Sequence, residues 1–154
     1  GELTDADKDI LTQADGMHAL ARAAMQTQAL NKYLDAVWAV VAEANRYFAG
    51  EEPWAKKKTD FKRMETILYV TAELVRQVAI LAQPVMPEGT AKLLDLLGVD
   101  EGARGFDQLG RVGRLAPGTA LPAPVGVFPR YIAPEEQERR AQEGKASGKG
   151  KKHG

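Results

Sequence analysis

The chain has 154 residues, a length that fits one ordinary domain, and its 21 basic residues are balanced by 21 acidic residues. This balance creates no overall field that would favour a nucleic acid or a membrane, although a local basic patch remains compatible with it. Cysteine is absent, which excludes disulfides and thiolate metal sites and fits a reducing compartment, so we expect the cytoplasm. No apolar run approaches the ~18–20 residues of a membrane span. A chain that begins with Gly1 is expected to be a fragment of something longer.

Two amphipathic helices are predicted in the first third of the chain. Residues 4–26 form the first, because Thr4 and Asp7 have the spacing of a capping box. Its apolar residues recur at steps of four and three: Ile10, Ala14, Met17, Ala21 and Ala24. The second follows an N-cap at Thr27, and its apolar face contains Leu30, Leu34, Val37, Val41, Ala44 and Phe48. Trp38 lies beside this face, and we expect it to pack in the core or between helices.

A corner is predicted where the second helix ends. Gly50 can take the left-handed conformation that stops a helix. Pro53 suits the start of a new helical turn. Trp54 is therefore presented just past a helix end, and three lysines follow it closely: Lys56, Lys57 and Lys58.

A third helix is predicted between Asp60, which can cap it, and about Ala82, because the residue before Pro84 avoids helical conformation. One apolar stripe consists of Met64, Leu68, Thr71, Val75, Val78 and Ala82, and a second consists of Ile67, Leu74 and Leu81. A helix so apolar should be the most buried one. We therefore expect almost complete burial of Leu68, Val75 and Val78.

The predicted organisation is an all-α helical bundle with an irregular C-terminal extension. A short fourth helix begins at Pro87 and reaches Leu97, with Gly98 as its left-handed end. Residues 1–98 form the bundle. Residues 99–133, rich in Gly and Pro, form an irregular extension that packs back on the protein. Residues 134–154 form a charged, largely disordered tail in which Lys and Gly dominate.

Several motifs in order resemble the anticodon-binding domain of bacterial methionyl-tRNA synthetase, a class-I enzyme. They are Ala44-Asn45-Arg46-Tyr47-Phe48, Pro53-Trp54-Ala55, Ile67-Leu68-Tyr69-Val70, Ile80-Leu81-Ala82-Gln83-Pro84-Val85-Met86-Pro87, Leu93-Leu94-Asp95-Leu96-Leu97-Gly98 and Val127-Phe128-Pro129-Arg130. The resemblance covers roughly residues 1–132. It implies an enzyme that joins methionine to tRNA using ATP and magnesium.

The resemblance also implies two partners, namely the methionine-specific tRNA, bound through its anticodon, and the catalytic domain of the synthetase. The class-I adenylation signatures His-Ile-Gly-His and Lys-Met-Ser-Lys-Ser are absent from this chain. We therefore expect recognition without catalytic residues, and no cofactor or metal in the chain itself. The Asn-Leu-Ala-x-Arg-like pattern of an earlier helix is absent too, so the first helix of the family bundle is expected to be missing and the anticodon site to be incomplete.

The resemblance assigns Trp54 to stacking on the first anticodon base, whereas the residues alone also allow it to pack the loop against the bundle. Pro53 would fix the backbone that presents the ring. Asn45 can read a base edge or brace the loop by bonding its backbone.

Four cations near this corner can contact phosphates, which position RNA without specifying its sequence. They are Arg46, Lys56, Lys57 and Lys58, and a solvated charged face is the alternative for each. The rival function is a helical module that binds a protein partner and has no RNA role of its own.

Overall fold

The computed structural model describes residues 1–129, 131–136 and 139. Its α-helices are α1 (Asp5–Gln26), α2 (Leu30–Glu51), α3 (Pro53–Thr59), α4 (Phe61–Ala82) and α5 (Pro87–Leu96). Two short 3-10 turns follow, η1 (Glu101–Ala103) and η2 (Phe106–Gln108). The described residues contain helices and irregular segments but no strand, which confirms the predicted all-α class. Of the tail predicted at residues 134–154, only residues 134–136 and 139 lie within the described part.

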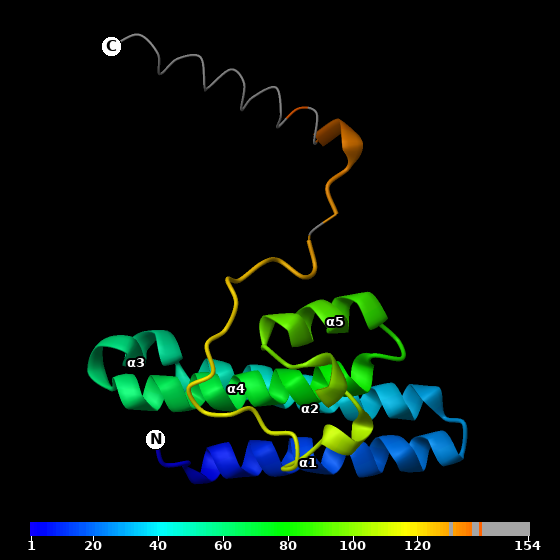
Figure 1. Cartoon of the computed structure of the whole chain (residues 1–154), viewed down its shortest axis with the longest axis horizontal. Coiled ribbons are helices and arrows are strands. Elements are labelled where there is room, and N and C mark those ends of the chain that lie inside the picture. Colours follow the sequence, from blue (N-terminus) through cyan, green and yellow to red (C-terminus); the bar gives the residue numbers. More distant parts are fainter. Residues whose placement is uncertain (130, 137–138, 140–154) are drawn as a thin grey trace.

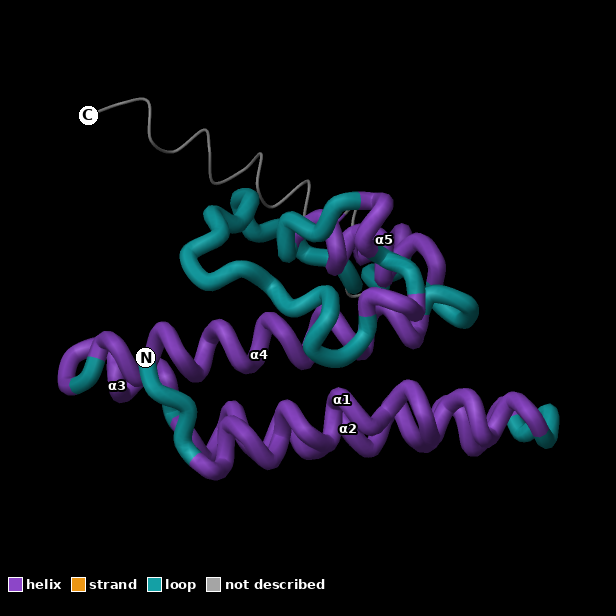
Figure 2. Tube along the Cα trace, turned by 60° about the horizontal axis from the view of Figure 1, so that its bottom comes forward, coloured by secondary structure: helices purple, strands orange, loops and turns teal. Residues whose placement is uncertain are grey.

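The helices stack in layers around α4. α1 and α2 form an antiparallel pair, and α4 packs against both of them (Figure 1). Figure 2 shows α5 on the opposite side of α4 from this pair. The irregular segment after α5 reaches α1, where Arg114 binds Asp15 at 2.8 Å. α3 folds back against the start of α4, at the same end of the bundle as the N-terminus. Among the described residues, no helix is both long and apolar enough to cross a bilayer.

Most predicted helix ends are confirmed. Thr4 and Asp7 form the capping box of α1, Asp60 caps α4, and Pro87 opens α5. Gly98 has the expected left-handed backbone, with φ 66°.

Two predicted helix ends are wrong. Thr27 ends α1 instead of starting α2, whose N-cap is Ala29. Gly50 stays inside α2, and the left-handed residue is Glu52, with φ 45°. α2 runs on to Glu51 because that carboxylate binds Arg63 of α4 at 2.8 Å, so the turn falls later in the chain.

The predicted buried face of α4 is partly wrong. Leu68 is 45% exposed, and Val75 and Val78 are only half-buried. The helix instead buries the face that contains the second predicted stripe, Ile67, Leu74 and Leu81. Val70 and Ile80 are buried on the same face. This face also carries polar residues, which obscure it in the hydrophobic periodicity of the sequence.

Those polar residues form a buried network. Glu73 accepts two bonds from Arg76, at 2.9 and 2.7 Å, and one from Gln77 at 3.1 Å. Arg76 also donates to the carbonyl oxygen of Gln108 at 2.8 Å, and Glu73 accepts from the Leu115 N–H at 3.1 Å. The network therefore ties the first part of the extension, up to Leu115, to the bundle, where Val99 and Leu109 are also buried.

The later part of the extension is more exposed. Leu121 and Val125 are more than half exposed, and Phe128 is 63% exposed. The Phe128 ring nevertheless lies close to Gly89 of α5. A Cβ atom placed on that glycine would come within 2.7 Å of the ring.

The α4 assignment predicts unequal costs for two leucine truncations on one helix. Leu74→Ala should lower the free energy of unfolding by about 2–5 kcal/mol, because Leu74 is 1% exposed and its truncation leaves a cavity. Leu68→Ala, the matched control, should cost less than about 1 kcal/mol. Urea denaturation of both variants measures the difference, and equal costs would show that the wrong face has been assigned to the core.

Candidate functional site

The α2–α3 corner presents Trp54 to solvent. Glu52 turns the chain in the left-handed conformation, and buried Pro53 is the first residue of α3. The Trp54 side chain is 59% exposed and tilts against Phe48 of α2, with ring centroids 5.8 Å apart and an interplanar angle of 58°. Phe48 thus supports the indole ring, while more than half of Trp54 remains available to a ligand.

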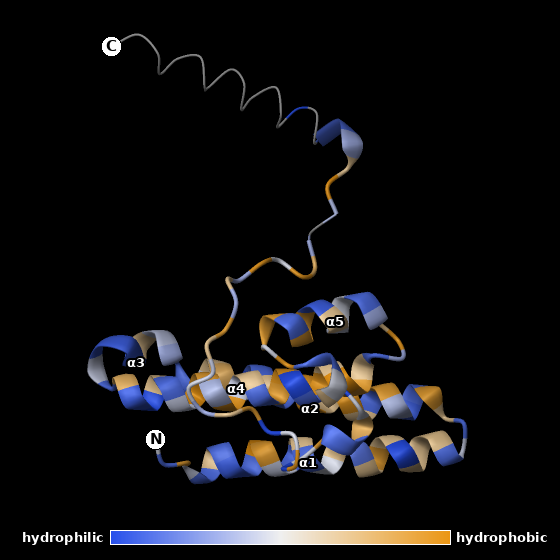
Figure 3. Cartoon of the chain, in the orientation of Figure 1, coloured by the Kyte–Doolittle hydropathy of each residue, from blue (hydrophilic) through white to orange (hydrophobic). Residues whose placement is uncertain are grey.

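Helix geometry separates the three lysines of α3. Lys57 and Lys58 follow Trp54 by three and four residues, so they share its side of the helix. Lys56 lies on the other side and is half-buried. No ion pair joins any of the three to a described residue. All three stand in the last turn of α3, where positive charge also favours the helix (Figure 3 shows α3 as largely hydrophilic).

Asn45 and Arg46 differ in their availability. Asn45 is exposed one helical turn before Phe48, and its amide makes no hydrogen bond within the described residues. The bracing role considered for it is therefore absent here. Arg46 pairs with Glu43 on the same helix, with Nε at 3.2 Å from the carboxylate, so a phosphate would have to compete with that partner.

The expectation that Trp38 packs internally is wrong. Its side chain is 45% exposed. Trp38 precedes Asn45 by seven residues, which places the two on one side of α2. The buried face of α2 instead includes Tyr33, Val37 and Val40.

A polar network behind the corner joins three helices. Buried Asp7 of α1 receives hydrogen bonds from Arg63 of α4, with Nη2 at 2.9 Å from Oδ1, and from the Tyr47 hydroxyl of α2. Arg63 also bonds Glu51, the last residue of α2, at 2.8 Å. From the sequence, Asp7 was recognised only as a cap, Tyr47 only within a motif, and Arg63 had no predicted role, since nothing in the sequence shows that these positions meet.

The network shifts the ionisation of its members. Burial would raise the pKa of Asp7, but hydrogen bonds from Arg63 and Tyr47 outweigh it and lower the pKa from 3.8 to about 2. Burial and the bond to Asp7 raise the pKa of Tyr47, and the bonds to Asp7 and Glu51 raise the pKa of Arg63. Asp7 is therefore an anion and Arg63 a cation at neutral pH, so the three helix ends are held by charge as well as by packing.

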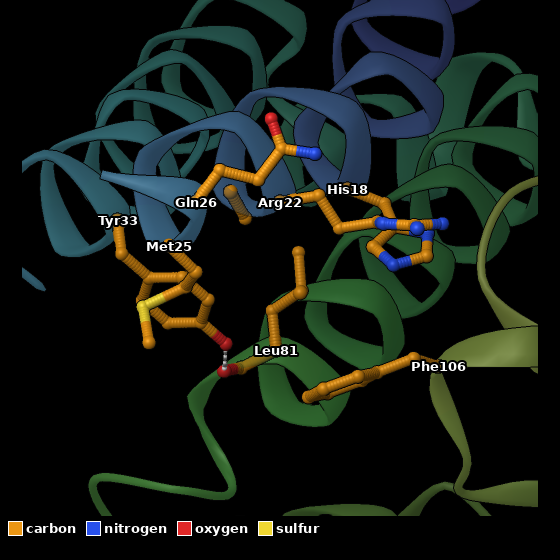
Figure 4. Close-up of a pocket in the computed structure, with 8 residues that line it drawn as sticks. His18, Arg22, Met25, Gln26, Tyr33, Leu81 and Phe106 are labelled. Carbon is orange, nitrogen blue, oxygen red and sulfur yellow. Dashed lines mark hydrogen bonds between the residues drawn. The ribbon is translucent and has the colours of Figure 1, made fainter. Parts of the chain in front are cut away.

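A separate pocket lies toward the other end of the bundle (Figure 4). It measures about 380 Å³ and is lined by His18, Ala21, Arg22, Met25, Gln26, Tyr33, Leu81 and Phe106. The Tyr33 hydroxyl donates to the Leu81 carbonyl oxygen, and burial raises the pKa of Tyr33. None of the residues predicted for the functional site lines this pocket. Among the described residues, no group of three His, Cys, Asp or Glu side chains could hold a metal ion.

The Asp7 network predicts an acid-dependent part of the stability. The folded pKa is lowered, so the contribution of Asp7 is full above the unfolded pKa of 3.8 and disappears as pH falls through about 2. Asp7→Asn should therefore cost about 2 kcal/mol near neutral pH, and the gap from the wild type should close on acidification. Urea unfolding at several pH values tests this. Asp5→Asn, at an exposed acid in the same turn, is the control, and parallel curves for Asp7→Asn and the wild type would contradict the prediction.

Comparison with known proteins gives one consistent family. Residues 1–150 match the family described as the anticodon binding domain of methionyl tRNA ligase. A methionine–tRNA ligase of Rhizobium meliloti is 58% identical over 135 residues, which cover 88% of this chain and 26% of that protein. One from Mycobacterium tuberculosis is 46% identical over 142 residues, covering 90% and 27% respectively.

Solved structures agree. The free form of Mycobacterium tuberculosis methionyl-tRNA synthetase has a TM-score of 0.81 at 47% identity, covering 87% of this chain and 27% of that one. The same enzyme in complex with methionyl-adenylate has a TM-score of 0.79, covering 84% and 26%. The chain thus spans about a quarter of the length of the relatives that it matches. It belongs to the family of anticodon-binding domains of methionyl-tRNA ligase.

Proposed function

We propose that this chain reads the anticodon of methionine-specific tRNA as the C-terminal part of a methionine–tRNA ligase. The observation that carries the proposal is the exposed Trp54 beside lysines that form no ion pair with a described residue, in a chain of the anticodon-binding family. Unpaired bases in RNA loops are commonly recognised by stacking on aromatic rings. The corner offers such a ring on a rigid support, since Phe48 backs it and the Asp7 network fixes the helix ends.

The chemistry of the ligase would lie outside this chain. A matched synthetase structure contains methionyl-adenylate, and the chain corresponds to about a quarter of that protein. We infer that the remaining part, the catalytic domain, uses ATP with magnesium to activate methionine, that it is the second partner of this domain, and that the enzyme works in the cytoplasm.

Each corner residue has a role in the proposal. Trp54 stacks on an anticodon base, and Pro53 sets the backbone that presents it. The free amide of Asn45 is suited to a base edge. Lys57 and Lys58 meet the phosphates on the same side as the ring, with Lys56 and Arg46 in lesser roles. The rival protein-interaction module gains no support from the relatives named above, all of which are ligases.

Replacing Trp54 separates recognition from chemistry. In the full-length ligase, Trp54→Ala should weaken tRNA binding by about 1–3 kcal/mol, a factor of about 5 to 150, because the stacking surface is gone. Methionine-dependent ATP exchange should persist. Trp54→Phe should recover part of the affinity, since a smaller ring still stacks. Normal tRNA charging by Trp54→Ala would reduce Trp54 to a packing residue and refute the proposed site.

The lysines of α3 give an independent test of which side of this helix faces the RNA. Removing one lysine–phosphate ion pair should lower the slope of log K against log salt by about 0.7 for single-stranded RNA. Lys57→Gln and Lys58→Gln should each show this change. Lys56→Gln, which removes the same charge from the other side of α3, should change the slope less. Equal slopes for all three variants would mean that α3 presents no particular side to RNA.

A further inference from the structure

Phe61 is a second exposed aromatic residue beside the lysines. It is the first residue of α4 and is 56% exposed. The aromatic contacts within the described residues do not involve it. So exposed a ring contributes little to the core, because the hydrophobic gain follows the area removed from water.

The surroundings of Phe61 are positively charged. Lys57 and Lys58 precede it and Lys62 follows it, and none of the three pairs with a described acid. Two acids lie nearby: Asp60, which accepts the Arg63 N–H at 3.0 Å as the cap of α4, and exposed Glu65, one turn further along α4. The cluster therefore keeps an excess of positive charge that a polyanion can satisfy.

Phe61 and Trp54 lie at opposite ends of α3. Trp54 is in its first turn, and Phe61 follows its last residue after Asp60 alone. From Trp54 to Thr59, the last residue of α3, the helix rises about 7–8 Å at ~1.5 Å per residue, and Phe61 lies beyond the turn at Asp60. The lysines of α3 lie between the two rings in the chain.

We propose that Phe61 is a second stacking surface, for another unpaired nucleotide of the RNA loop that Trp54 engages. Lys57, Lys58 and Lys62 bind the phosphates near the two rings. This inference rests on the proposed function and extends its site from one ring to two. Single-stranded RNA fits the surface better than an apolar protein does, because its bases stack on aromatic rings while its phosphates pair with lysines that a protein contact would have to desolvate.

The test measures binding of methionine-specific tRNA to the full-length ligase. Phe61→Ala and Phe61→Leu should each weaken binding about fivefold to tenfold, because both lack a ring. Phe61→Tyr should bind within about twofold of the wild type, because its ring still stacks. Leu68→Ala is the control, since Leu68 is a 45% exposed apolar residue on the same helix, and it should bind normally.

Combining modified RNAs with the protein variants identifies the nucleotide that stacks on Phe61. The loop nucleotides are replaced one at a time by abasic nucleotides, and each RNA is bound to the wild type, to Phe61→Ala and to Trp54→Ala. One abasic RNA should make Phe61→Ala neutral, and a different one should make Trp54→Ala neutral. If Phe61→Ala weakens the binding of every RNA by the same factor, the proposed stacking on Phe61 is refuted.

The two proposals fail in different ways. If Trp54→Ala weakens binding while Phe61→Leu binds like the wild type, the second stack is refuted and the proposed function stands. If Trp54→Ala and Phe61→Leu both bind like the wild type, the proposed function is refuted together with this inference. Thermal unfolding of each variant, with Phe61→Tyr as the ring-bearing reference, shows whether a variant that binds weakly is still folded.

Discussion

The bonding of Arg63 to buried Asp7 is the constraint on which the corner of this structure depends. A carboxylate removed from water is costly unless several donors satisfy it, and Asp7 has Arg63, Tyr47 and the Thr4 N–H. These donors come from α4, from α2 and from the start of α1. Removing Arg63 would leave the buried Asp7 carboxylate without its cation, so the three helix ends keep one arrangement.

A second buried polar network fixes the position of the extension on the bundle. Glu73 and Arg76 are fully buried, and their remaining bonding capacity is satisfied by the backbone of Gln108, Gly110 and Leu115. Gln77 donates to Asp15 at 3.0 Å and accepts from the Gly110 N–H at 3.2 Å. An irregular segment without its own ladder of hydrogen bonds thereby acquires a fixed path across the bundle.

These constraints suit the proposed role. Recognition of an RNA loop by stacking needs exposed rings on a support that does not yield, because motion of the ring would cost binding energy. Trp54 and Phe61 stand on the short α3 segment and its junction with α4, and α3 packs on α4. The pocket around Phe106 shares no residue with this surface, so the proposed site is an exposed corner rather than that cavity.

Local patterns in the sequence determined the helices and the corner. Capping residues, prolines and a left-handed glycine act within a few residues, so α1, α4 and α5 begin where Thr4, Asp60 and Pro87 indicate. The Pro53-Trp54 pair and the three lysines that follow it could also be identified from the sequence, because they lie within a few residues of one another. The order of the motifs indicated the family.

Tertiary contacts decided the rest. Hydrophobic periodicity predicted two candidate faces on α4, and the buried one is the face whose polar residues find partners from Asp15 to Leu115, far apart in sequence. Likewise, Glu51 extends α2 past Gly50 because Arg63 lies within reach only in the folded chain. The exposure of Trp38 could not be predicted either, because burial depends on which helices cover a face, and a single helix does not encode its neighbours.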